Sequence, residues 1–266
     1  MSTYVASRVD SLADRWQEVD ILILEAAKER GNTALYNVLC RSTTLLVVAH
    51  LEGFMKDVAK DIIQDINSFS SFKSSPIFLK RTFCKQFIDT NSDTSIDPRM
   101  RKMIDVFDGL ETKFAVDPFL VEGNYGTNKN PSPTVISKIC SNFGVDNFFW
   151  LINGSRLDLV FSGTTSEVIE LAKELHEHVS TGVSQFPYGT SPAIFRIVEK
   201  GNPSNKNRTI WETFLDNVLS HRHDIAHGSS FENSLAVEEL QDFRNKVQIL
   251  QYAIIIVLCN KIIPKL

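Results

Sequence analysis

Residues 33–66, TALYNVLCRSTTLLVVAHLEGFMKDVAKDIIQDI, contain the most regular pattern of apolar side chains in the sequence. The apolar positions recur every three or four residues, a spacing that brings them to one face of an α-helix. They are Val47, Leu51, Phe54, Val58 and Ile62. Charged side chains lie largely off this stripe, at Lys56, Asp57, Lys60 and Asp61. The segment is therefore predicted to form one long amphipathic helix.

Segments on both sides of this helix show the same pattern. Apolar side chains recur at steps of three and four in residues 10–30, in residues 165–186 and in the segment that starts at Thr209. The final helix is predicted to begin at the N-cap Ser234 and to continue until Pro264 ends the pattern. The sequence has no internal repeat and little strand signal, so the predicted fold class is all-α.

The middle of the chain interrupts this helical pattern. A Ser- and Phe-rich connection leads to Pro76, and shorter helices are predicted at residues 76–88 and 98–113. We interpret residues 68–161 as an insertion between two halves of a helical core. Residues 1–266 are then expected to form a single domain that contains this insertion.

Composition and charge limit the classes of protein to which the chain can belong. Hydrophobic residues make up 43% of the 266 and charged residues 23%, which is ordinary for a globular protein with a substantial core. The formal net charge is −4 and the sequence pI is about 5.9. These values exclude a polycation that coats nucleic acid with its whole surface. We expect any RNA to bind at a local basic patch.

Nothing in the sequence indicates export or membrane insertion. Residues 1–10 are polar where a signal peptide needs an apolar stretch. The most apolar run, Tyr252–Cys259, is much shorter than the roughly 20 residues that cross a bilayer, so it is predicted to be a core helix. The four cysteines form no CxxC pair. We therefore expect a cytoplasmic protein with reduced thiols and no contact with a membrane.

The densest group of reactive side chains is SHRHDIAHG at residues 220–228, which holds three of the six histidines. In a first interpretation, Arg222 and His227 cleave RNA without a metal ion. An imidazole can take or give a proton, and a guanidinium can hold phosphate oxygens bidentately. The 2′-hydroxyl would then attack the adjacent phosphorus, leaving a 2′,3′-cyclic phosphate and a 5′-hydroxyl.

The spacing of Arg222 and His227 does not place them on one face of an ideal helix. Five residues rotate the side chain by roughly 140° net. Arg222 falls on the apolar stripe of its helix, whereas His227 directly precedes Gly228, where the helix is predicted to end. Either a turn at this end brings His227 round, or the pairs from two subunits converge across an interface.

Two other interpretations of the same segment stay open. His223 and His227 have the i, i+4 spacing of a zinc-binding HExxH motif, which would make the protein a zinc-dependent hydrolase. Asp224 replaces the glutamate of that motif, however, and no extended signature supplies a third ligand. Alternatively, Arg222 and the histidines only stabilise the C-terminal end of a helix, where cations complement the macrodipole.

Two stretches of the sequence resemble HEPN domains. RHDIAHG at residues 222–228 resembles their R-x4–6-H motif, and TLLVVAHLEGF at residues 44–54 resembles the long second helix of stand-alone HEPN proteins related to the RiboL-PSP-associated branch. The likeness covers roughly residues 15–66 and 165–266 and does not extend to the insertion. It implies a HEPN-type helical bundle that acts as a homodimer, with both motifs in one cleft.

The resemblance also implies metal-independent endoribonuclease activity on an RNA substrate, with no cofactor. Arg222 and His227 are the motif residues, and His223 is the adjacent polar position. An earlier helix of such proteins often supplies a polar residue that faces the site, for which His50 or Glu52 is the candidate. Asp224 is a further possible supporting residue.

In a biological context, the resemblance implies a toxin or an abortive-infection effector in bacterial defence. Such a protein is often held inactive by an antitoxin or another partner protein of the defence system. The main alternative is a non-catalytic HEPN module that binds a nucleotide or a protein in a defence complex.

Overall fold

The computed structural model describes residues 2–88, 96–120, 130–199, 207–228 and 235–263. Within these ranges the chain forms α-helices and short 3-10 helices and no strand, so the predicted all-α class is correct. The α-helices are α1 (Tyr4–Lys28), α2 (Thr33–Phe69), α3 (Ile77–Lys85), α4 (Ile96–Gly109), α5 (Pro133–Asn142), α6 (Phe148–Ile152), α7 (Leu159–Ser162), α8 (Thr165–Val183), α9 (Ile210–Ala226) and α10 (Val237–Lys261).

Most helix ends lie within a few residues of the predicted positions, and the first helix is the exception. The first helix begins at Tyr4 instead of residue 10, because the side chain of Thr3 caps it by accepting a hydrogen bond from the backbone N–H of Ala6. The last helix begins at Val237 with Ala236 as the N-cap. The predicted N-cap Ser234 itself lies outside the described residues.

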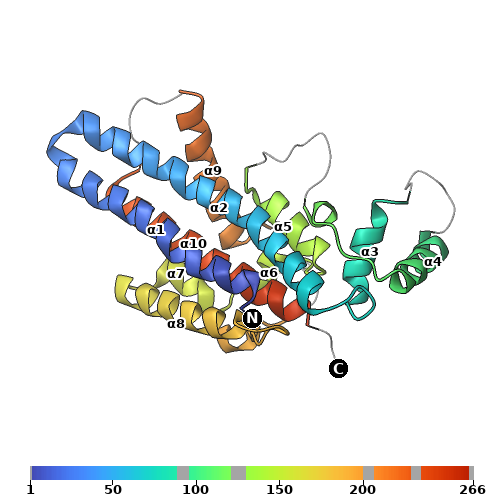
Figure 1. Cartoon of the computed structure of the whole chain (residues 1–266). Helices are drawn as coiled ribbons and strands as arrows, with labels where there is room; N and C mark the ends of the chain where they lie inside the picture. Colours follow the sequence, from blue (N-terminus) through green and yellow to red (C-terminus); the bar gives the residue numbers. More distant parts are fainter. Residues whose placement is uncertain (1, 89–95, 121–129, 200–206, 229–234, 264–266) are drawn as a thin grey trace.

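The centre of the fold is an antiparallel hairpin of α1 and α2 that packs on α10 (Figure 1). The five apolar residues of the predicted stripe on α2 each expose 1% of their surface or less. On α10, every residue of Tyr252–Cys259 is buried, so this run is a core helix as predicted. The periodic apolar positions therefore form the interior between these three helices.

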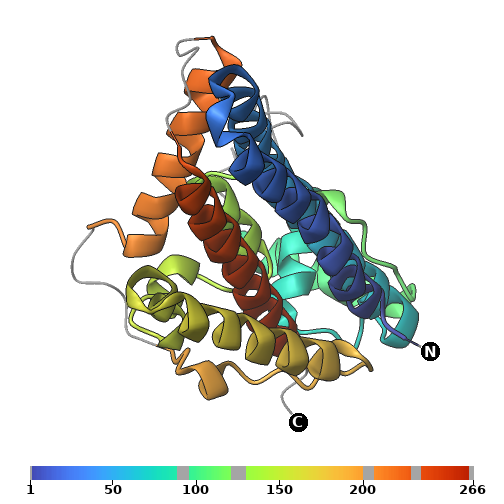
Figure 2. The ribbon, with the colours of Figure 1, turned by 90° about the vertical axis from the view of Figure 1, so that its left-hand side faces the viewer.

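The remaining long helices surround α10. Figure 2 shows α10 between α1 and α9, with α8 crossing near its C-terminal end. The rings of Phe214 on α9 and Phe243 on α10 meet edge to face, with centroids 5.5 Å apart. On its other side α9 contacts α2. The helix that carries the reactive cluster is thus held from two directions by the core.

The middle of the chain forms the end of the molecule that lies away from the turn between α1 and α2 (Figure 1). There α3 and α4 pack on a cluster of aromatic rings that includes Phe72, Phe83 and Phe114. The chain then returns to the bundle, where α5 contacts both α2 and α9. That residues 68–161 are an insertion stays a prediction.

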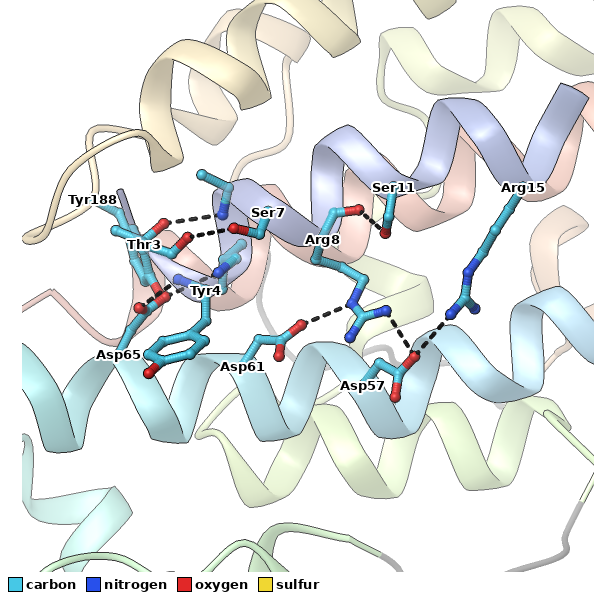
Figure 3. A network of polar contacts seen from close by, with 12 residues as sticks. Thr3, Tyr4, Ser7, Arg8, Ser11, Arg15, Asp57, Asp61, Asp65 and Tyr188 are labelled. Carbon is cyan, nitrogen blue, oxygen red and sulfur yellow. Dashed lines mark hydrogen bonds and ion pairs between the residues drawn. The ribbon is translucent and has the colours of Figure 1, made fainter. Parts of the chain in front are cut away.

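A buried carboxylate ties the beginning of α1 to α2 (Figure 3). Asp65 on α2 is fully buried and accepts hydrogen bonds from the backbone N–H groups of Tyr4 and Val5, at 2.7 and 3.1 Å. The hydroxyl of Tyr188 donates a third bond to the same carboxylate, at 2.6 Å. Negative charge at a helix N-terminus is stabilising, so Asp65 fixes the position of α1 from another helix.

By length and composition alone, α2 is long and apolar enough to cross a membrane, and it is the only described helix that is. Its apolar stripe, however, packs against α1 and α10 inside the bundle. Core helices of globular proteins meet the same criterion, so this observation is weak evidence for a membrane span.

Candidate active site

The helix that carries the reactive cluster has well-defined signals at both ends. At its beginning, Thr209 and Glu212 form a capping box, in which each side chain accepts from the backbone N–H of the other residue. At its end, His227 is the C-cap and Gly228 has a φ of +66°, the left-handed conformation that glycine adopts most easily. The predicted end of the helix near Gly228 is therefore correct.

Arg222 lies on the side of α9 that faces α2. Its guanidinium Nη2 is 3.9 Å from Oε2 of Glu52, and the two side chains are 29% and 20% exposed. The other carboxylate oxygen of Glu52 accepts a hydrogen bond from Lys56 Nζ, at 3.1 Å. Both side chains therefore remain partly in contact with solvent.

His223 and His227 lie at the exposed end of α9. Their ring centroids are 4.2 Å apart with an interplanar angle of 50°. Both residues are exposed, as expected for side chains one turn apart on the surface of a helix. Within the described part of the chain, no hydrogen bond or ion pair joins His227 to Arg222. The left-handed Gly228 thus does not bring the two motif residues of one chain into a hydrogen bond or an ion pair.

The candidate residues on α2 point to different neighbours. Whereas Glu52 faces Arg222, His50 faces α1, and its ring centroid is 5.8 Å from that of Trp16. The side chain of His50 is only 10% exposed, and its Nε2 is 3.9 Å from Oε2 of Glu18. Burial lowers the pKa of His50, while Glu18 acts in the opposite direction. Burial between α1 and α2 thus favours the neutral form of His50, and the residue lies on a different side of α2 from the one that faces the guanidinium of Arg222.

The remaining candidate, Asp224, is half-buried on α9, and its side chain makes no hydrogen bond or ion pair with any described residue. In the same part of the chain, no group of three or more His, Cys, Asp or Glu side chains is arranged to hold a metal ion. The third ligand that a zinc hydrolase would need beside His223 and His227 is therefore not provided by the described residues.

Lys56 also belongs to this site and was not predicted from the sequence. It brings a second cation to the carboxylate that faces Arg222. Its i, i+4 spacing from Glu52 on a predicted helix was the available signal, because such pairs lie on adjacent turns. Glu52 thus brings together two cations, one from α2 and one from α9, while the two exposed imidazoles lie at the end of α9.

The sequence matches a known protein family. A family model described as RiboL-PSP-HEPN matches residues 10–260. No curated protein and no solved structure matches the chain. The matched range contains all of the candidate site residues.

Proposed function

The chain belongs to the RiboL-PSP-HEPN family, which indicates a nuclease or an RNA-related module, and on this basis we propose that it is a metal-independent endoribonuclease. The observation that carries the proposal is the placement of Arg222. The motif arginine is accessible and faces a carboxylate from α2, while two imidazoles lie at the exposed end of the same helix.

In the proposed reaction, Arg222 holds the scissile phosphate and stabilises the charge that develops on its oxygens. His227 serves as the general acid/base, and His223 is an auxiliary polar group beside it. The 2′-oxygen loses its proton and bonds to phosphorus, and the bond to the 5′-oxygen breaks as that oxygen gains a proton. The products are a 2′,3′-cyclic phosphate and a 5′-hydroxyl, and no metal ion takes part.

The proposal includes a homodimer. In one chain His227 does not contact Arg222, so a second copy that brings its own motif across an interface would complete the site. Apolar side chains exposed on the α1–α2 hairpin support such an interface. Ile21 and Leu24 on α1 are 52% and 60% exposed, and Val38 and Leu45 on α2 are 48% and 37% exposed. Exposed apolar side chains gathered on neighbouring helices are typical of surfaces between proteins.

A charge introduced on this hairpin is expected to weaken the dimer. In the Val38→Glu Leu45→Glu variant, two carboxylates would have to be desolvated at the interface, so the mass measured by light scattering should shift toward the monomer. The matched control is Ile169→Glu on α8, which is also exposed, at 61%. Equal masses for both variants and the wild type would contradict the proposed interface.

The nuclease proposal is tested with end-labelled RNA and purified protein in excess EDTA. We expect cleavage by the wild type that leaves cyclic-phosphate ends. The matched control is the Arg222→Ala His227→Ala double variant, purified in parallel, which should leave the RNA intact. RNA binding without cleavage by the wild type would instead favour a non-catalytic HEPN module. Activity that EDTA abolishes would favour a zinc hydrolase.

Glu52 is proposed to position Arg222 without touching the substrate. Replacing it in Glu52→Gln removes the charge that orients the guanidinium, so we expect kcat to fall by roughly tenfold, which corresponds to about 1.4 kcal/mol, with little change in KM or thermal stability. The matched control is Asp57→Asn on the same helix, a carboxylate that pairs with Arg8 and Arg15 on α1 instead of with Arg222. The positioning role would be contradicted if Glu52→Gln left kcat unchanged, or if its main effect were a loss of thermal stability.

In the cell, the proposed nuclease would be a cytoplasmic toxin or abortive-infection effector of a bacterial defence system, restrained by an antitoxin or another partner protein. Its expression is then expected to arrest growth, whereas the double variant should be tolerated. Tolerance of both proteins at equal levels would contradict the proposed role as a toxin.

A further inference from the structure

The two histidines at the end of α9 form a pair whose geometry suits more than acid–base chemistry. His223 and His227 are both exposed, and their ring centroids are 4.2 Å apart. One turn of helix separates them, so both imidazoles project from the same side. His227 is the C-cap of α9, and Gly228 directly after it has the left-handed conformation.

Two imidazoles on one side of a helix can chelate a metal ion. Neutral imidazole is a common ligand for zinc and copper, with Zn–N distances of about 2.0–2.1 Å. The rings are tilted by 50°, so rotation of exposed side chains is enough to direct one nitrogen of each toward a shared ion. Water would fill the remaining positions. Magnesium and calcium prefer oxygen ligands and do not suit this pair.

We propose that His223 and His227 form a binding site for a divalent transition-metal ion such as Zn²⁺, and that the bound ion inhibits the nuclease. The inhibition rests on the proposed function, whereas the metal site does not. A nitrogen that is coordinated to zinc has no lone pair left to accept a proton, so His227 can no longer act as the general base. Zinc bound here therefore inhibits cleavage, whereas the zinc of a zinc-dependent hydrolase promotes it.

The metal site is tested by zinc binding alone. We expect saturable binding of ZnCl2 to the wild-type protein, measured by competition with a chromophoric chelator. His223→Ala and His227→Ala should each weaken it by roughly tenfold to a hundredfold, because the helix holds the second imidazole at a high effective concentration. The matched control is His221→Ala on the same helix, whose ring lies near Phe243 with centroids 6.0 Å apart.

Thermal unfolding of each variant shows whether the fold is retained, and all three are expected to stay folded because the changes lie at the end of a helix. A site elsewhere would be indicated if both single variants bound zinc as tightly as the wild type, or if His221→Ala weakened binding equally. Either result, or no saturable binding by the wild type, would overturn the metal site.

The inhibition is tested by adding ZnCl2 to the RNA cleavage assay without chelator. Cleavage is expected to fall with the same concentration dependence as zinc binding and to recover when EDTA is added. Undiminished cleavage at saturating zinc would overturn the inhibition and leave the nuclease intact. An inactive wild type that still binds zinc through this pair would contradict the nuclease and leave the metal site standing.

Discussion

The Arg222→Ala variant is expected to cleave RNA about 10²–10³-fold more slowly than the wild type, the loss that follows removal of one group that stabilises the charge of a transition state. The Arg222 side chain is 29% exposed, and its guanidinium lies 3.9 Å from the carboxylate of Glu52, so its removal should disturb little of the fold. Single-turnover cleavage of end-labelled RNA measures the rate.

Comparing Arg222→Ala with Arg222→Lys shows whether positive charge alone is enough at this position. Arg222→Lys keeps the charge but loses the bidentate geometry, and we expect it to recover only part of the activity. The matched control is Arg208→Ala, an exposed arginine just before α9 that pairs with Glu212 and Asp216. Full activity in Arg222→Ala, or equal losses in Arg222→Ala and Arg208→Ala, would remove Arg222 from the proposed site.

For the second motif residue, His227→Ala is expected to lower the rate by about 10²–10⁴-fold, which is the contribution of a well-placed general acid or base. His227 is exposed at the C-cap of α9, and its ring lies against that of His223. A loss in His223→Ala that is clearly smaller would support the auxiliary role of His223. If His223→Ala were the more damaging change, the two roles would have to be exchanged.

The largest effect on stability is expected from Asp65. The Asp65→Ala variant would leave the backbone N–H groups of Tyr4 and Val5 and the hydroxyl of Tyr188 without their acceptor. Each buried donor without a partner costs about 1–3 kcal/mol, so we expect the free energy of unfolding to fall by about 3 kcal/mol or more. Urea unfolding followed by circular dichroism measures the change.

Tyr188→Phe provides the matched control, since it removes only one of the three hydrogen bonds. Burial raises the pKa of the Tyr188 phenol, so it stays protonated and acts as a donor. We expect this variant to lose about 1 kcal/mol, the usual net contribution of one hydrogen bond. An Asp65→Ala variant no less stable than Tyr188→Phe would show that the carboxylate does not hold the beginning of α1.

Much of the fold could be predicted because its signals are local. The stripe from Val47 to Ile62 and the run Tyr252–Cys259 both lie in the core, as their apolar periodicity and length indicate. The end of α9 followed from Gly228, which adopts the left-handed conformation. The early start of α1 was missed because Thr3 was not recognised as its cap.

The candidate site was predictable only in part. Both His50 and Glu52 were candidates for the polar residue that faces the motif. They lie two residues apart on the same helix, and the sequence does not show which side of that helix faces α9. The packing of α2 against α1 and α9 distinguishes them. It turns Glu52 toward Arg222 and buries His50 beside Trp16.

By itself, the sequence determined the all-α class, the buried face of each long helix and the cluster of reactive side chains at residues 220–228. These features depend on helical periodicity, capping and composition, which act between residues close in the chain. Only the tertiary structure decided that Glu52 meets Arg222 and that Asp65 holds the beginning of α1. These contacts join residues far apart in the chain, so local patterns carry no information about them.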